Sequence, residues 1–241
     1  EVKDGSTVLQ SVTATASNGV ATFSGLGADD SVVAGSFDIV YSSGALVDDS
    51  QSITVAKADL LVTATSPSVT YGSPAPVISP VFTGFEYSDD TTVLSTQPTC
   101  SSSYDDTDPA GSAVETSCSG AAAANYSFTY QTGAIAVSKA PVTITASDDS
   151  VAYLAPSLPA ITYTASGLVN GEDTSVFTTQ PTCSVAGYDR ETAVAGDTFT
   201  TSCSGAAAVN YAFTYVSGTL TVIKADQAAL SLTSTAGTFG S

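Results

Sequence analysis

The sequence contains no histidine, tryptophan or methionine, and its 241 residues include only five lysines and arginines. The missing histidine matters most, because histidine is the usual general base near neutral pH and a common metal ligand. Ser-His and Cys-His catalytic pairs are therefore excluded, and an enzyme would have to rest on carboxylates alone. No apolar run is long enough to span a membrane as a helix. From these absences we predict a protein that is not an enzyme.

Acidic residues far outnumber basic ones, since 23 aspartates and glutamates give a formal net charge of −18. Such a surface repels phosphate backbones and anionic lipids, so we expect no nucleic-acid partner and no direct insertion into a membrane. The ordinary explanation of the surplus acid is solubility. The sharper explanation is calcium binding, which needs six to eight oxygen ligands at a defined spacing.

The residues that are present favour strands over helices. Hydrophobic residues make up 43% of the chain and charged residues 12%, which provides enough apolar material for packed cores. Val142, Ile144 and Ala146 alternate with threonines, a period of two that turns one face of a strand inward. Asn18-Gly19, between residues 12–17 and 20–24, predicts a hairpin. We therefore predict an all-β chain of small β-sandwich modules.

Three phrases recur in the same order at nearly one offset, which is the signature of homologous modules. They are Gln-Pro-Thr-Cys at 97–100 and 180–183, Cys-Ser-Gly-Ala-Ala-Ala at 118–123 and 203–208, and Asn-Tyr-x-Phe-Thr-Tyr at 125–130 and 210–215. Tyr71 and Tyr153 fit the same scheme.

A Lys-Ala step closes each module, at Lys57, Lys139 and Lys224. The steps predict a first segment at 1–57, truncated at its start, a first repeat at 58–139, a second repeat at 140–224, and the start of a further module at 225–241. Linkers this short limit bending, so we expect an extended array. A lysine that forms a covalent crosslink is an alternative role for these positions.

The four cysteines form one pair in each repeat. Cys100 and Cys118 lie in the first repeat, and Cys183 and Cys203 occupy the matching positions of the second. We predict a disulfide within each repeat, because a zinc site needs four clustered ligands and the two pairs lie in different modules. Disulfides imply an oxidising, extracytoplasmic setting.

Paired aspartates provide the only calcium candidates, which are Asp49, Asp105, Asp108 and Asp148. None matches a known calcium-loop spacing, so solvated turns are the simpler interpretation and no cofactor is expected. Asn125-Tyr126-Ser127 has the pattern of a glycosylation site, but its counterpart Asn210-Tyr211-Ala212 does not, which favours chance. Tyr126, Phe128 and Tyr130 alternate as core residues do, although a sugar-stacking surface would have the same pattern.

The two repeats resemble the MBG-type repeat of large bacterial surface and adhesin proteins. The resemblance rests on 69–74 (Val-Thr-Tyr-Gly-Ser-Pro), 167–173 (Gly-Leu-Val-Asn-Gly-Glu-Asp) and 210–222, which begins Asn-Tyr-Ala-Phe. The second repeat departs from it with Leu154 where the first has Gly72. Residues 1–57 resemble a bacterial Ig-like repeat through 18–23 and 53–57. The resemblance implies a secreted or cell-surface protein with no catalytic residues.

Three functions remain open. The first is a structural stalk or spacer that carries a distal domain away from the cell, with the neighbouring modules of the same chain as its contacts. The second is an adhesive module that binds a cell-surface glycan or protein, through the unlike loops at 101–111 and 184–196. The third is self-assembly of copies into an extracellular filament or surface layer, since sheet edges can pair.

Overall fold

The computed structural model describes residues 1–4, 6–18, 20–25, 33–44 and 48–225. Every regular element in these ranges is a β-strand, apart from two short 3-10 turns, so the prediction of an all-β chain of tandem modules is confirmed. Within the same ranges, no helix has the length and apolarity to cross a membrane. The further module predicted at 225–241 lies outside the described residues except for Ala225.

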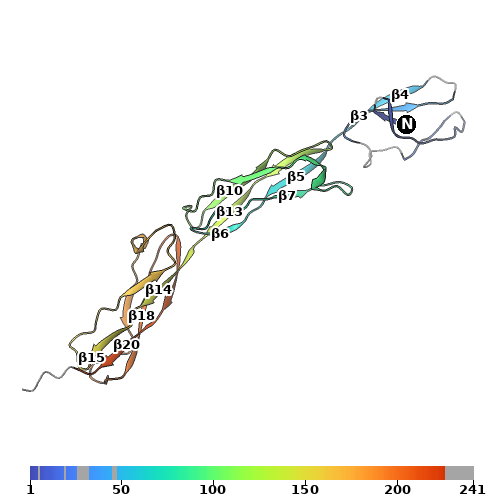
Figure 1. Ribbon diagram of the computed structural model, residues 1–241. Helices are drawn as coiled ribbons and strands as arrows, with labels where there is room; N and C mark the ends of the chain where they lie inside the picture. The colour runs from blue at the N-terminus through green and yellow to red at the C-terminus, as the bar shows by residue number, and fades with distance from the viewer. Residues whose placement is uncertain (5, 19, 26–32, 45–47, 226–241) are drawn as a thin grey trace, which may run out of the picture. The chain divides into compact units, whose positions relative to one another are not determined.

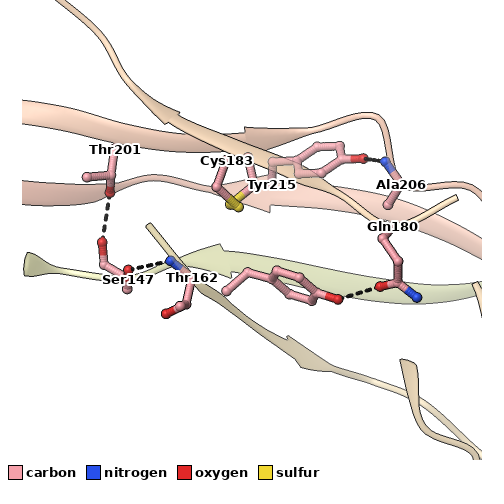
Figure 2. Close-up of a disulfide and its surroundings, with 9 residues drawn as sticks. Ser147, Thr162, Gln180, Cys183, Thr201, Ala206 and Tyr215 are labelled. Carbon is pink, nitrogen blue, oxygen red and sulfur yellow. Dashed lines mark hydrogen bonds between the residues drawn. A yellow bond between two sulfur atoms is a disulfide. The ribbon is translucent and has the colours of Figure 1, made fainter. Parts of the chain in front are cut away.

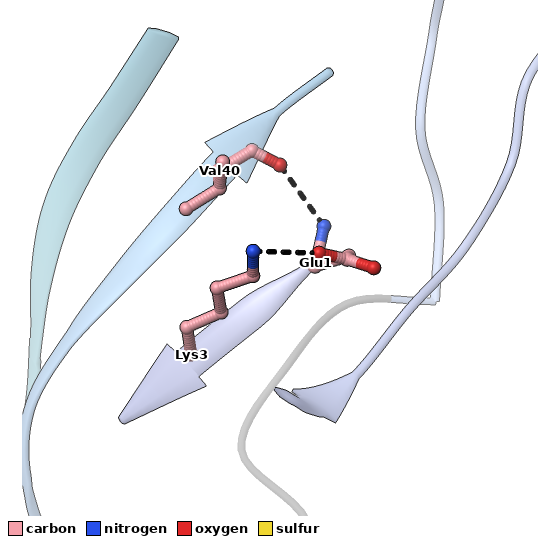
Figure 3. A network of polar contacts seen from close by, with 3 residues as sticks. All are labelled: Glu1, Lys3 and Val40. Carbon is pink, nitrogen blue, oxygen red and sulfur yellow. Dashed lines mark hydrogen bonds and ion pairs between the residues drawn. The ribbon is translucent and has the colours of Figure 1, made fainter. Parts of the chain in front are cut away.

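The first segment forms one four-stranded sheet in the order β2-β1-β3-β4. Its strands are β1 (Val2–Asp4), β2 (Thr7–Gln10), β3 (Gly35–Tyr41) and β4 (Asp49–Val55). Val2 and Phe37 are buried at its centre. Where β1 begins beside β3, as Figure 3 shows, the Glu1 nitrogen donates to the Val40 carbonyl at 3.1 Å, and Lys3 pairs with the Glu1 carboxylate at 3.0 Å.

Of the hairpin predicted at 12–24, the turn is present but the two flanking strands are not. Ser17 and Val20 exchange two main-chain hydrogen bonds of 2.8 and 3.1 Å, and Asn18 between them has a φ of 53°. Residues 11–16 and 21–24 are not strands. These flanks are mostly exposed and pair with no other strand of the described ranges, and an isolated two-stranded ribbon is marginal in water.

The first repeat is built from two facing sheets, with order β12-β5-β7 in one and β6-β13-β10-β9 in the other, plus the small pair β11-β8 (Figure 1). Its strands are β5 (Ala58–Ala64), β6 (Ser68–Thr70), β7 (Pro80–Thr83), β8 (Leu94–Thr96), β9 (Thr99–Ser102), β10 (Ala113–Ser119), β11 (Ala122–Ala123), β12 (Tyr126–Gln131) and β13 (Gly133–Ser138). Val62 on β5 packs with Cys118 on β10, so the core lies between the sheets.

The second repeat has the same plan, with sheets β16-β14-β19 and β15-β20-β18-β17. Its strands are β14 (Ala140–Ala146), β15 (Asp149–Ala152), β16 (Tyr163–Ser166), β17 (Thr182–Val185), β18 (Thr198–Ser204), β19 (Tyr211–Val216) and β20 (Gly218–Ile223). Strands β14 and β19 run parallel, as do β15 and β20. The alternating residues Val142, Ile144 and Ala146 of β14 are all buried, as their period of two predicts.

A short 3-10 turn occupies the same place in both repeats, η1 (Thr91–Val93) and η2 (Thr174–Val176). Asp90 and Asp173 cap these turns by accepting main-chain hydrogen bonds from Thr92 and Ser175, both at 2.8 Å. Hydrogen bonds from Thr92 hold the pKa of Asp90 below its ordinary value. An acidic residue directly precedes each capping aspartate, Asp89 before Asp90 and Glu172 before Asp173. By capping the turn, the aspartate also fixes the position of this preceding acid.

The described chain divides into two compact units. The first unit contains Glu1–Ser68, Ala75–Asp105 and Ala113–Ala136. The second unit contains the chain from Val137 onward together with two loops of the first repeat, Val69–Pro74 and Asp106–Ser112. In the first unit, residues of segment 1–57 therefore meet the first repeat. In the second unit, two loops of the first repeat meet the second repeat. We call these two places the first and the second junction.

Candidate functional site: the repeat junctions

The structure joins the cysteines within their own repeats. Cys100 on β9 lies directly opposite Cys118 on β10, and Cys183 on β17 lies opposite Cys203 on β18. Both pairs are disulfides, with S–S distances of 2.01 and 2.05 Å, and the described residues include no free cysteine.

Around the second disulfide, main-chain groups are held by side chains (Figure 2). The fully buried Thr201 hydroxyl donates to the Ser147 carbonyl at 2.9 Å, and Ala206 donates to the Tyr215 hydroxyl at 2.8 Å. The disulfide joins β17 and β18 within one sheet. The Thr201 bond connects β18 with Ser147, which directly follows β14 of the facing sheet.

The first two Lys-Ala steps are bonded into the repeats that they open. Lys57 donates from Nζ to the Ala123 carbonyl at 3.1 Å, and Lys139 donates to the Ala208 carbonyl at 2.9 Å. The next residue does the same with its main chain, since Ala140 donates to the Asn210 carbonyl at 2.9 Å. Lys57 and Lys139 are thus bonded to main-chain carbonyl oxygens, and not to the side-chain carboxyl or carboxamide groups that the crosslink left open by the sequence would need.

Each Asn-Tyr phrase contributes an asparagine that contacts residues preceding its repeat. Asn125 Oδ1 accepts a hydrogen bond from the Ala34 amide at 3.0 Å, across the first junction. Asn210 Oδ1 accepts from the Ala110 amide at 3.1 Å, across the second junction. Each pair lies inside one compact unit. Both junctions therefore use the side-chain oxygen of an asparagine at the matching position of the repeat as the acceptor, although residues 1–57 and the first repeat differ in sequence.

The tyrosine of each Asn-Tyr phrase is buried and donates to an acid. The Tyr126 hydroxyl donates to Asp89 Oδ2 at 2.7 Å, and the Tyr211 hydroxyl donates to Glu172 Oε2 at 2.5 Å. Burial, followed by the hydrogen bond to Glu172, raises the pKa of Tyr211 to about 12. Burial and then the Asp89 contact raise the pKa of Tyr126 as well.

At the second junction, Tyr71 completes this arrangement. Its hydroxyl donates to the other oxygen of the Glu172 carboxylate at 2.9 Å. The Tyr71 and Tyr211 rings meet edge to face, with centroids 5.6 Å apart and planes at 85°. One carboxylate thus joins a tyrosine of the first repeat to a tyrosine of the second, in a site where Tyr71 and Tyr211 are both buried. Charge-assisted hydrogen bonds of this kind are among the stronger polar contacts in proteins.

Two further contacts close the second junction. Asn170 Nδ2 donates to the Asp106 carbonyl at 3.0 Å. Gly72, with a φ of 80°, lies so close to Val169 that a Cβ atom placed on it would be 2.3 Å from the Val169 Cγ2 atom. Glycine is therefore favoured at position 72 by the left-handed backbone conformation and required there by the close approach of Val169.

The four calcium candidates are not assembled into a ligand cage. Asp49 accepts from the Ser50 amide at 2.9 Å, and Asp148 accepts from the Thr219 amide at 2.7 Å. Within the described ranges no three acidic or cysteine side chains are grouped closely enough to hold a metal ion, and Asp105 and Asp108 belong to no such group. Asp49 and Asp148 thus act as local caps of strand ends.

The sequence prediction missed the junction residues, although their signal was present. Asn125 was interpreted as a chance glycosylation pattern and Tyr126 as a core residue, and Tyr126 is indeed buried. The signal that could have identified them is the recurrence of both residues as a pair at Asn210-Tyr211. A polar residue that both copies of a repeat keep directly before a buried tyrosine indicates a bonded side chain.

Comparison with protein families matches both repeats to one family, the MBG domain (YGX type), at residues 60–136 and 142–221. The chain belongs to this family. Tyr71-Gly72-Ser73 has the tripeptide form that the family name describes, so the junction tyrosine and glycine of the first MBG repeat are part of that signature. The match does not extend to residues 1–57. A comparison with curated proteins gave no match.

MBG repeats are non-catalytic structural modules, typical of bacterial surface proteins. The two disulfides agree with this setting, because disulfides persist in oxidising compartments outside the cytoplasm.

Proposed function

We propose that this chain is a structural spacer of a bacterial surface protein, in which consecutive modules are held by bonded junctions and a distal domain is carried away from the cell wall or outer surface. The main observation in support of this proposal is the Glu172 carboxylate, which accepts hydrogen bonds from Tyr71 of the first MBG repeat and Tyr211 of the second. A chain of independent binding modules would have no need of such a contact.

The first junction supports the same role. Asn125 accepts from Ala34, which precedes the first MBG repeat, as Asn210 accepts from Ala110. The lysines that open the repeats are bonded into the body of the following repeat, so little free chain is left between one module and the next. Short, bonded connections restrict the relative motion of modules, whereas a flexible linker would let them move independently.

Small-angle scattering from the full chain, with and without junction bonds, tests the proposal. We expect Glu172→Ala combined with Asn210→Ala to broaden the distribution of interatomic distances, because the bonds of the second junction are lost. Tyr153→Phe is the matched control and leaves the distribution unchanged, since its hydroxyl makes no hydrogen bond to the described residues. Identical scattering from the wild type and the junction variant contradicts the proposal. So does specific binding of a glycan or whole cells that survives loss of both junctions, which favours an adhesive module.

A further inference from the structure

The second MBG repeat has a surface that matches the surface around Tyr71 at the second junction. We call it the Tyr153 surface, and it consists of Tyr153, Leu154, Ala195 and Gly196. The Tyr153 amide donates to the Ile223 carbonyl at 2.8 Å, as the Tyr71 amide donates to Ser138 at 2.9 Å. The Gly196 amide donates to the Val222 carbonyl at 2.8 Å, as the Gly111 amide donates to Val137 at the same distance. The main chain is thus arranged in the same way at both ends.

The two surfaces differ in what covers them. Tyr71 is 4% exposed because Glu172 and Tyr211 lie against it, whereas Tyr153 is 39% exposed. Ala195 occupies the turn position of Ala110, whose amide donates to Asn210, and Ala195 is exposed. The Tyr153 surface therefore offers a tyrosine hydroxyl and an Ala195 amide where the second junction uses both groups. Among the described residues, no carboxylate accepts from this hydroxyl and no asparagine accepts from this amide.

The Lys-Ala step gives the direction in which the chain would continue. Lys139 and Ala140 bond to Ala208 and Asn210 of the repeat that they open. Lys224 and Ala225 stand in the same position after β20. A module that continues from Lys224 would receive these residues in the same way.

One residue sets which module fits. Leu154 takes the place of Gly72 and has the same left-handed backbone, with a φ of 57° against 80°. At the second junction, a Cβ atom on Gly72 would lie 2.7 Å from the Cβ atom of Val169 and 2.3 Å from its Cγ2 atom. Leucine at this position therefore collides with any side chain that begins with a Cβ atom at the Val169 position. Val169 of the second repeat and Glu86, its counterpart in the first, both have one.

We propose that the Tyr153 surface binds a further MBG-type module that continues from Lys224 in the same polypeptide, and that this module has a carboxylate and an Asn-Tyr pair matching Glu172, Asn210 and Tyr211, with glycine at the position of Val169. This inference rests on the proposed function and extends it, because it makes the order of modules depend on Leu154. Neither MBG repeat of this chain can take that place in the geometry of the second junction.

The test inserts a second copy of residues 140–224 into the full chain, directly after Lys224, in three forms. The copy is inserted unchanged, inserted with Val169→Gly in the copy, or inserted unchanged next to Leu154→Gly in the original repeat. Nitration by tetranitromethane, mapped by peptide mass spectrometry, reports the exposure of each tyrosine. Tyr71 serves as the internal reference for a covered tyrosine.

We expect nitration of Tyr153 to fall to the level of Tyr71 in the second and third forms, and to stay as in the present chain when the copy is unchanged. Equal protection by the unchanged copy overturns the glycine requirement. A Tyr153 that stays reactive in all three forms while Tyr71 remains protected overturns the docking surface. Free reactivity of Tyr71 in the present chain overturns the proposed function itself, whatever Tyr153 does.

Discussion

The hydroxyl of Tyr71 donates to a carboxylate oxygen of Glu172, a residue 101 positions further along the chain. Because the same carboxylate also accepts from Tyr211, its two oxygens are shared between the two MBG repeats. Through this contact, we expect the stability of one repeat to depend on the other. Its strength can be measured with substitutions that remove single oxygen atoms.

Removal of the Tyr71 hydroxyl tests this dependence. We expect Tyr71→Phe to lower the free energy of unfolding of the second repeat by about 2 kcal/mol, because the hydrogen bond has a charged, partly buried acceptor. Tyr153→Phe, at the matching position of the next repeat, changes it little. A cycle with Glu172→Gln isolates the pairwise energy, measured by urea unfolding. Equal effects of the two Tyr→Phe substitutions contradict the prediction.

The raised pKa of Tyr211 predicts a loss of stability in alkali. Its pKa is about 12 in the fold against an ordinary value of 10.0, so the folded state holds the proton more tightly than the unfolded state. The stabilisation from Tyr211 is therefore complete below pH 10 and is lost as the pH rises through about 12. We expect the stability difference between the wild type and Tyr211→Phe to shrink over this window, because loss of the Tyr211 proton removes the hydrogen bond only in the wild type. A constant difference would show that the protonated hydroxyl is not favoured by the fold.

Gly72 and Gly111 form a matched pair for the close approach of Val169. Both have a positive φ, 80° and 93°, but a Cβ atom on Gly111 meets open space. Gly111→Ala should cost only the left-handed backbone conformation, about 1 kcal/mol. Gly72→Ala should cost clearly more, and Val169→Gly in the same chain should remove the excess. Thermal unfolding monitored by circular dichroism gives both values, and equal losses at the two glycines would contradict the contact.

The asparagine at the second junction can be tested at a single amide. Asn210→Ala removes the acceptor for the Ala110 amide, and we expect hydrogen exchange of that amide to accelerate about fivefold, corresponding to a net hydrogen bond of about 1 kcal/mol. Asn210→Asp retains an oxygen acceptor and should keep the amide protected. Exchange measured by NMR distinguishes the two. Unchanged protection in Asn210→Ala would mean that the amide is shielded by burial alone.

Each disulfide closes a loop of similar length, with sequence separations of 18 and 20. Replacing both cysteines of either pair by alanine should lower the stability of that repeat by about 3 kcal/mol, chiefly because the unfolded chain gains freedom. The other repeat, with its own disulfide intact, provides the control within one molecule. Hydrogen exchange of β10 and β18 amides reports each repeat separately, and a loss in both repeats from one pair would contradict local stabilisation.

The cysteine pairs and the strands could be predicted from the sequence because both leave local or repeated signals. Val142 and Ile144 alternate with threonines, and burial on one face of β14 follows from that spacing. Cys183 and Cys203 recur at the positions of the first pair, and the structure places them opposite each other on neighbouring strands. A repeat thus indicates which residues belong to one module.

The junctions could not be predicted, because their contacts join residues that no periodicity relates. Nothing near Tyr71 indicates that its acceptor is Glu172, and the close approach that requires Gly72 is made by Val169 on a distant loop. The strands predicted on either side of Asn18 were wrong for a different reason. The turn residues are local signals, but strands need a partner surface, and residues 11–16 are mostly exposed.

The parallel pairing of β15 with β20 has a mechanical consequence. The chain enters the second repeat through β14, which leads into β15, and leaves it at the end of β20. A pull between Ala140 and Ile223 would hold β15 back while drawing β20 forward, so the two strands would have to slide past each other. The register from Asp149 opposite Leu220 to Ala152 opposite Ile223 would then be loaded all at once, instead of opening one bond at a time. A surface protein exposed to flow or to a tethered neighbour would resist extension through this pair of strands.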